Sequence, residues 1–173
     1  MKSSAKRPAT ARSGRPLSGL VYFEDRGTVY DAPLDVLWDF MEKDEKFHPK
    51  AHSGAVRNFV EKSLSEVTVL LSYERRRRGQ WEKLVCRMTT MRPAVRVQED
   101  LDGPYAGTKT VYLYTPQGKR TAVDIFGYAQ SSELTPDEIK RDKKQTFSRA
   151  FSEDVPYLRR FAEQHPSLQT KRK

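Results

Sequence analysis

Hydrophobic and polar residues alternate along most of the middle of the chain, from about residue 56 to residue 128. Alternation with a period of two is typical of strands that bury one face, and short turns between such strands favour hairpins. The expected strands cover residues 20–30, 56–61, 67–73, 81–91, 94–101, 111–114 and 121–128. The pattern therefore predicts an antiparallel sheet of about six or seven strands, and the Asp25–Arg26–Gly27 step predicts a bulge in the first one.

Two short helical segments are expected between the first strand and the rest of the sheet. Pro33 suits the first position of a helix, with Asp31 or Ala32 before it as the cap. Apolar residues then recur at helical spacing on one face: Leu34, Leu37, Trp38 and Met41. A second piece, helical or irregular, is expected to follow at about residues 47–54.

The last element has the clearest signal, a long helix over residues 135–164. Thr135, Pro136 and Glu138 fit a capping box, in which the threonine caps and the glutamate reaches back to it. A mostly apolar stripe follows at helical spacing: Ile139, Lys143, Phe147, Ala150, Phe151, Asp154, Leu158 and Phe161. Pro156 removes one backbone donor, so we expect a kink just before it.

The order of these elements resembles the helix-grip fold of the START and birch-pollen-allergen superfamily, also called SRPBCC or polyketide cyclase/dehydrase-like proteins. The resemblance spans residues 20–164 and is carried by the strand-to-helix segment 29–38, the turn 102–108 and the hairpin 116–121. It implies an α+β fold, in which a curved antiparallel sheet wraps around the long C-terminal helix and two short helices follow strand 1.

The resemblance also implies a function, namely binding or transport of a small hydrophobic or amphipathic ligand in an internal cavity, with no required cofactor. Residues that the pattern directs inward are candidates to line that cavity: Trp81, Met88, Tyr112, Tyr114, Phe126, Phe147 and Phe151. A register error of one residue reverses the direction of a side chain, so we expect about half of them to contact a ligand and the rest to be core.

A second implication of the resemblance is enzymatic, since some members of the superfamily catalyse reactions. A cyclase or dehydratase acting on a polyketide-like or aromatic substrate needs little beyond positioning and one acid or base. An interior with aromatic residues alone favours carriage of a ligand, whereas a polar group that faces inward favours catalysis. Which residues would be catalytic is left open.

The polar candidates are His48, His52 and Asp154. Two histidines four residues apart share one face of a helix, and a carboxylate on an apolar stripe needs a donor. In a helix-grip fold the short helices lie near the later half of the long helix, so these three residues are predicted to form a polar pole at the mouth of the cavity, where they are also candidate metal ligands. The alternative is two loop histidines and an aspartate beside a kink.

The chain has 173 residues and a net charge of +9, but this charge is concentrated at its two ends. Residues 1–19 carry five basic and no acidic residues, and residues 171–173 add three basic ones. We therefore expect a basic tail at 1–18, a folded domain at 19–165 and a second basic tail at 166–173. Nucleic acid is expected to bind only non-specifically through these tails, and this is the third possible function.

The remaining composition points to a soluble cytoplasmic protein. No apolar run approaches the roughly 18 residues of a membrane span, and no apolar stretch follows the basic N-terminus. Cys86 is the single cysteine, which excludes an internal disulfide, and its place in a strand favours a buried small hydrophobic residue.

Arginine fills positions 75–78, beside Trp81. These residues fit either a phosphate contact or a solvated hairpin turn. The flanking Glu74 and Glu82 weaken the basic field, which favours the solvated turn.

Overall fold

Seven antiparallel strands form a single sheet in the computed structural model, which describes residues 19–44, 48–77 and 79–165, with the backbone alone for residues 48 and 49. The strands are β1 (Val21–Tyr30), β2 (Val56–Ser63), β3 (Thr68–Arg77), β4 (Gln80–Met91), β5 (Val95–Asp100), β6 (Lys109–Gln117) and β7 (Arg120–Ala129). Their order in the sheet is β1-β7-β6-β5-β4-β3-β2. The strands β2 to β7 therefore pair in the order of the sequence, and β1 pairs with the last strand, β7. The predicted antiparallel meander is confirmed, whereas the two predicted tails lie outside the described residues.

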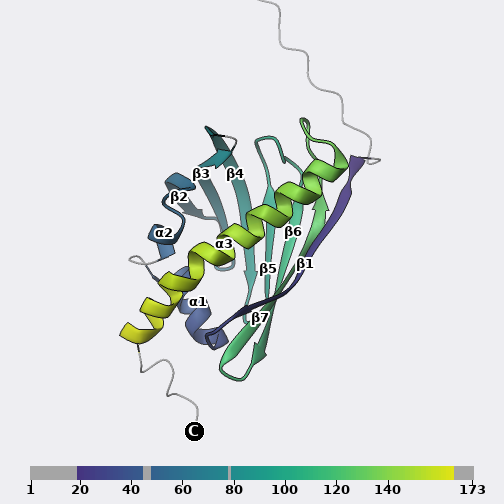
Figure 1. The fold of residues 1–173 in the computed structure, drawn as a ribbon. Coiled ribbons are helices and arrows are strands. Elements are labelled where there is room, and N and C mark those ends of the chain that lie inside the picture. Colours follow the sequence, from purple (N-terminus) through teal and green to yellow (C-terminus); the bar gives the residue numbers. More distant parts are fainter. Residues whose placement is uncertain (1–18, 45–47, 78, 166–173) are drawn as a thin grey trace, which may run out of the picture.

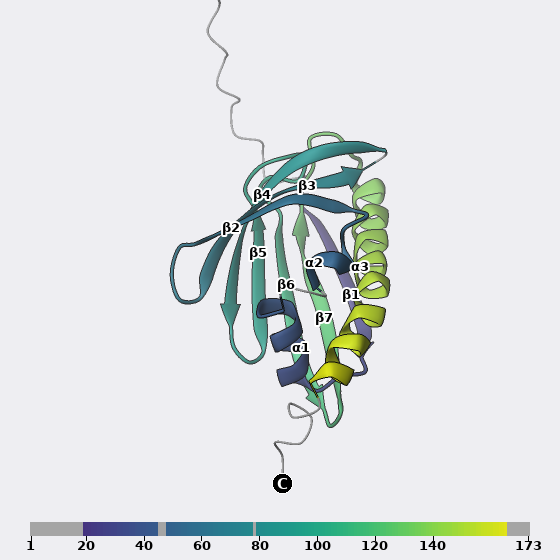
Figure 2. The same cartoon turned by 90° about the vertical axis from the view of Figure 1, so that its left-hand side faces the viewer.

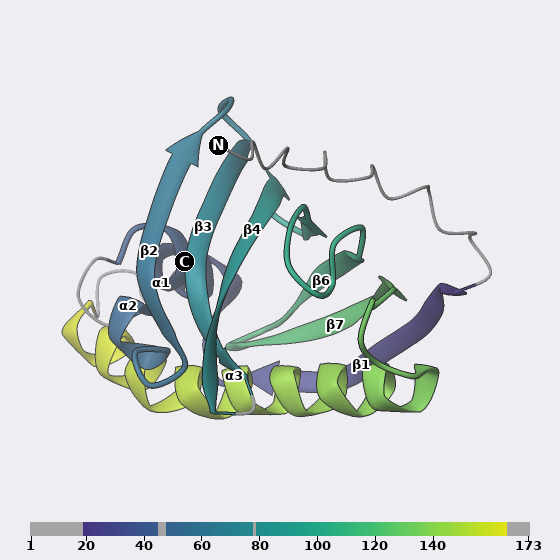
Figure 3. The ribbon, with the colours of Figure 1, turned by 90° about the horizontal axis from the view of Figure 1, so that it is seen from above.

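Three helices accompany the sheet: α1 (Leu34–Glu42), α2 (His48–Ala51) and α3 (Pro136–Gln164). The long helix α3 crosses the sheet on one side (Figure 1), and α2 lies between β2 and α3 (Figure 2). Seen from above, β1 runs alongside α3, while β2, β3 and β4 extend away from it (Figure 3). The predicted sheet wrapped on a long C-terminal helix is therefore confirmed.

The ends of α3 and the bend in β1 arise from local sequence. Glu138 N donates to Thr135 Oγ1 over 3.4 Å, and Thr135 N donates to Glu138 Oε2 over 2.9 Å, which completes the predicted capping box. The register of β1 on β7 shifts between Asp25 and Thr28, where Gly27 adopts a φ of 85°. A glycine tolerates this left-handed conformation, so the predicted bulge is confirmed.

Two local predictions are wrong at the ends of elements. Pro33 is the N-cap of α1 rather than its first residue, and no side chain caps that helix, because the preceding turn leaves Asp31 exposed. The arginine run is not a hairpin turn, since β3 continues through Arg77. Pairing with β4 extends the strand there, and a turn assignment based on charge alone overlooked that pairing.

The hydrophobic core occupies one half of the molecule. Its buried members come from α1, α3, β1, β6, β7 and the loop around Tyr105, and Val36, Leu37 and Phe40 of α1 are completely buried. The backbone of α3 packs on β1 far more closely than on β3, β4, β5 or β6. The core therefore fixes the helix to one edge of the sheet and leaves the central strands less tightly covered.

No helix within the described ranges is both long enough and apolar enough to cross a membrane.

Candidate ligand-binding site

The face of the sheet that is turned toward α3 is incompletely packed over its central strands. The register places Leu84, Cys86 and Met88 on this face, and all three are buried. Their neighbours on the same face are only partly buried: Val69, Leu71, Tyr73, Gln98, Asp100 and Tyr112. Solvent therefore reaches side chains that point toward the helix, and we refer to this face of β3 to β6, together with the facing side of α3, as the interior.

Five of the seven predicted lining residues lie on this side of the sheet or on α3. The Tyr112 ring meets Phe147 edge-on at 6.5 Å between centroids, and Phe151 meets Tyr30 at 5.0 Å. Tyr114 is buried against Trp38, and Met88 is also buried. Tyr112 and Phe151, which keep partial exposure, are thus the best placed of the five to contact a ligand.

Trp81 and Phe126 do not face the interior. Trp81 has the opposite parity to Leu84 on β4, and the Arg57 guanidinium lies 4.2 Å from the centre of its ring. Phe126 has the opposite parity to Ile125, whose side chain belongs to the core. Both predictions were wrong because successive side chains of a strand alternate between faces, so an error of one position reverses the direction.

A polar cluster that the sequence did not reveal lies in the middle of the interior. Lys143 Nζ lies 3.8 Å from Asp100 Oδ2, and Gln98 Nε2 donates to Asp100 Oδ1 over 2.7 Å. The hydroxyl of Tyr112 donates to Gln98 Oε1 over 3.3 Å. We call Gln98, Asp100, Tyr112 and Lys143 the central polar cluster.

The surroundings of Lys143 explain why this lysine stands on an otherwise apolar stripe. Its ammonium group lies 4.4 Å from the centre of the Tyr105 ring, and its side chain is 9% exposed. Burial lowers the pKa of Lys143, while the charge of Asp100 acts in the opposite direction. The position of a lysine within the stripe was the one sequence signal for this cluster, whereas the parity of Gln98 and Asp100 needed the register.

His52 and Asp154 meet at the end of the interior where α2 packs on α3. His52 Nδ1 lies 2.8 Å from Glu153 Oε2, and His52 Nε2 lies 3.1 Å from Asp154 Oδ1. The second contact has the distance of an ion pair without the direction of a hydrogen bond. The other oxygen of Asp154 accepts a hydrogen bond from the Tyr30 hydroxyl over 3.0 Å. The sequence therefore identified a real contact between His52 and Asp154.

This geometry favours the charged form of His52. A neutral imidazole carries one N–H and one lone pair, so one of the two carboxylates would face a lone pair. Burial alone would lower the pKa of His52, but Asp154 and Glu153 outweigh it and raise the pKa above its ordinary value. Burial, followed by the charge of Asp154, raises the pKa of Tyr30 as well. The four residues thus form a clamp that joins α3 to β1 and to the turn after α2, and we refer to it as the clamp.

The predicted metal ligands are His48, His52 and Asp154, and the structure describes the side chains of the last two. The side chain of His48 lies outside the described residues. Both ring nitrogens of His52 face carboxylates, so neither presents a free lone pair to a metal ion. Within the described part of the chain, no group of three or more histidine, cysteine or acidic residues has an arrangement that could hold a metal.

Glu153 was missed as a partner of His52. Two adjacent carboxylates on a strand would point to opposite faces. In a helix, successive side chains lie only about 100° apart, so one imidazole placed between Glu153 and Asp154 contacts both. Cys86 is buried, and burial followed by the charge of Asp100 raises its pKa to about 12, so the thiol stays protonated.

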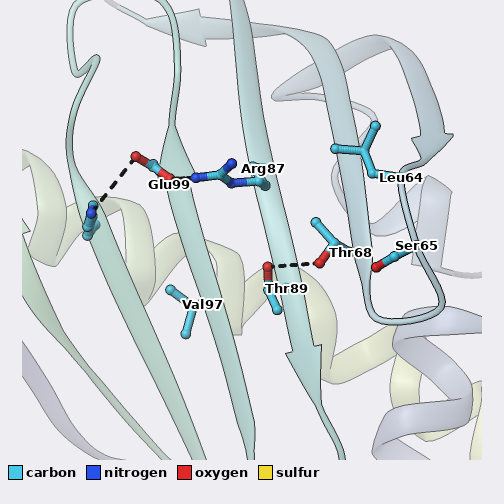
Figure 4. A pocket seen from close by; sticks show the side chains of 8 residues that line it. Leu64, Ser65, Thr68, Arg87, Thr89, Val97 and Glu99 are labelled. Carbon is cyan, nitrogen blue, oxygen red and sulfur yellow. Dashed lines mark hydrogen bonds and ion pairs between the residues drawn. The ribbon is translucent and has the colours of Figure 1, made fainter.

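A hollow of about 460 Å³ lies on the face of the sheet turned away from α3 (Figure 4). Its polar groups already pair with one another: Thr68 with Thr89 over 3.2 Å, and Arg87 with Glu99. None of the described residues that line this hollow is aromatic, whereas Tyr112 and Phe151 lie in the interior, so we place the candidate site there.

The comparisons with known proteins identify the fold. No family of related sequences matches the chain, and no curated protein matches it. Among solved structures, the Zhui aromatase/cyclase from Streptomyces sp. R1128 is similar with a TM-score of 0.64 and 13% identity, over 84% of this chain and 95% of that one. Ara h 8.0201 is similar with a TM-score of 0.63 and 12% identity, over 81% of this chain and 98% of that one.

A third structure, the di-domain aromatase/cyclase StfQ from the steffimycin biosynthetic pathway, has a TM-score of 0.63 and 14% identity. The similarity covers 86% of this chain and 52% of StfQ, so the chain spans about half of that protein. At such low identity the likeness concerns the fold and not the activity. The chain has the helix-grip fold that these aromatase/cyclases and Ara h 8.0201 share.

Proposed function

We propose that the protein binds a small hydrophobic or amphipathic molecule in its interior. The observation that carries this proposal is the partial exposure of side chains such as Leu71 and Tyr112, which point toward α3 from the middle of the sheet. A completely packed core would bury them. The α3 backbone also stays closer to β1 than to these strands, and we propose that the ligand lies beside them.

The side chains around this space suit a ligand with an apolar body and one polar group. Tyr112 and Phe151 offer aromatic surface, and the central polar cluster offers an ammonium, an amide and a carboxylate to the polar group. We assign His52 and Asp154, as the polar pole at the α2 end, a positioning role, because the two side chains already contact each other.

The proposal is tested by titrating the full-length protein with the neutral fluorescent probe N-phenyl-1-naphthylamine. We expect saturable binding that a panel of amphipathic lipids and aromatic compounds displaces. Native mass spectrometry of the protein purified from its own source would then reveal a retained molecule of a few hundred daltons. A linear, non-saturable response to the probe, together with a bare protein mass, would overturn the proposal.

A second candidate function is cyclase- or dehydratase-type catalysis, and the inward polar groups favour it. Lys143, with its pKa lowered by burial, lies beside Asp100, and such a pair can exchange protons with a bound carbonyl compound. Two of the structural neighbours are aromatase/cyclases. A model poly-β-ketone thioester should then be converted by the wild-type protein and not by Lys143→Met, with probe binding retained. Equal conversion by both proteins would exclude this role for Lys143.

A further inference from the structure

A groove of about 560 Å³ lies between the end of β3 and the first half of α3. Five arginines line it, Arg75, Arg76 and Arg77 from the strand and Arg141 and Arg149 from the helix, against two acidic residues, Glu138 and Asp142. We call it the arginine groove. Its charge is therefore strongly positive, although the folded domain as a whole is nearly neutral.

The carboxylates in and around the arginine groove already have other partners. Asp142 Oδ2 accepts a hydrogen bond from the Tyr105 hydroxyl over 2.6 Å, and Glu138 closes the capping box of α3. Glu82 and Glu133 both pair with Arg77, at 2.9 Å and 2.5 Å. These contacts neutralise Arg77, so the carboxylates leave the other arginines of the groove with little compensation.

Two guanidinium groups on the α3 side of the groove remain without a carboxylate. Among the described residues, Arg75 and Arg141 form no ion pair, and the Arg75 guanidinium lies 5.9 Å from the centre of the Tyr105 ring. Arg76 lies opposite Trp81 in the pairing of β3 with β4, so its side chain points to the other face of the sheet. Arg149 lies 3.7 Å from Glu153, which also holds His52. Like charges that line one groove repel one another, and a bound anion removes that repulsion.

We propose that the arginine groove binds a phosphoryl or pyrophosphoryl group. Guanidinium groups bind phosphate oxygens through two parallel hydrogen bonds. A groove with several guanidinium groups suits an anion that carries more than one charge better than it suits a single carboxylate. Gln145 and Thr146 also line the groove and can donate further hydrogen bonds. The volume of about 560 Å³ accommodates a pyrophosphate. This inference does not depend on the proposed function, because the groove is polar and needs no apolar ligand.

The test uses isothermal titration of the full-length protein with pyrophosphate. We expect saturable binding that weakens at least tenfold in Arg75→Ala/Arg141→Ala. The matched control is Lys140→Ala/Lys144→Ala, which removes two exposed charges from the same helix outside the groove and should change the affinity less than twofold. Circular dichroism, and the milder Arg75→Gln/Arg141→Gln pair, separate lost binding from lost folding.

Equal weakening by both pairs of substitutions would overturn the proposal, because it would assign the effect to net charge and not to the groove. The absence of saturable binding to the wild-type protein would overturn it as well. A second arm compares inorganic phosphate with hexyl phosphate. Equal affinities would indicate a free anion, whereas much tighter binding of hexyl phosphate would indicate that the anion is the head group of an amphipathic molecule.

Discussion

At the scale of single residues, the contact between His52 and two carboxylates is the most informative feature of the structure. One ring faces Glu153 and Asp154 at 2.8 Å and 3.1 Å, so the charged imidazolium is the form that both contacts favour. The pKa of His52 is consequently raised. The clamp links α2 to α3 across about a hundred residues of sequence, and its strength must depend on pH.

The stability of the fold is expected to decline as the pH rises through the pKa of His52. A histidine whose pKa is higher in the folded than in the unfolded state, where it is about 6.5, contributes its full stabilisation below that value and loses it above the folded pKa. Urea unfolding between pH 6 and pH 9 measures this decline. His52→Ala should flatten the curve. A curve that His52→Ala leaves unchanged would contradict the clamp.

Lys143 and Asp100 should show energetic coupling. Losing one member of a buried pair leaves the other charge without a partner, so Asp100→Asn and Lys143→Met should each destabilise the protein by about 1–3 kcal/mol. The double variant should cost less than the sum of the two, because no charge is then left unpaired. Denaturant unfolding of the four proteins gives the coupling directly, and strict additivity would show that the 3.8 Å contact is energetically unimportant.

At the scale of elements, the sequence predicted the strands and the long helix well and their ends and faces less well. Alternation in the strands and the Thr135–Glu138 capping box are local signals, and both were confirmed. The end of β3 depends on pairing with β4, which local charge does not report. The faces of Trp81 and Phe126 depend on register, which forms only when the whole sheet pairs.

The polar groups of the candidate site show the same division. Asp154 could be identified from the sequence because a carboxylate within an apolar stripe requires a donor, and His52 was near enough to supply one. Glu153 and the central polar cluster could not, because their partners come from β5, β6 and the turn after α2. Contacts between distant elements follow from the assembled fold and not from any single segment.

The capping box of α3 is expected to stabilise the molecule measurably. Thr135→Ala removes an acceptor for Glu138 N and should cost about 1 kcal/mol. Ser148→Ala, at an exposed position inside the same helix, is the control and should change stability by less than about 0.5 kcal/mol. Thermal unfolding followed by circular dichroism compares the two variants. Equal effects would mean that the N-terminal turn of α3 frays without consequence.

At the scale of the whole molecule, the fold is divided into a packed half and an accessible half. β1, β6, β7, α1 and α3 enclose the hydrophobic core, while the inward side chains of β3 and β5 remain partly exposed. The hydrophobic core therefore stabilises the fold mainly from one half of the molecule.

The most direct test of an interior binding site fills it with a larger side chain. Leu71 faces the interior from β3, and Leu70, its neighbour, faces the opposite side of the same strand. N-phenyl-1-naphthylamine is titrated into the wild-type protein, Leu71→Trp and Leu70→Trp, after circular dichroism has established that all three are folded. We predict that Leu71→Trp weakens binding of the probe at least tenfold and that Leu70→Trp leaves the affinity within twofold of the wild-type value. Wild-type affinity in a folded Leu71→Trp protein would contradict binding in the interior.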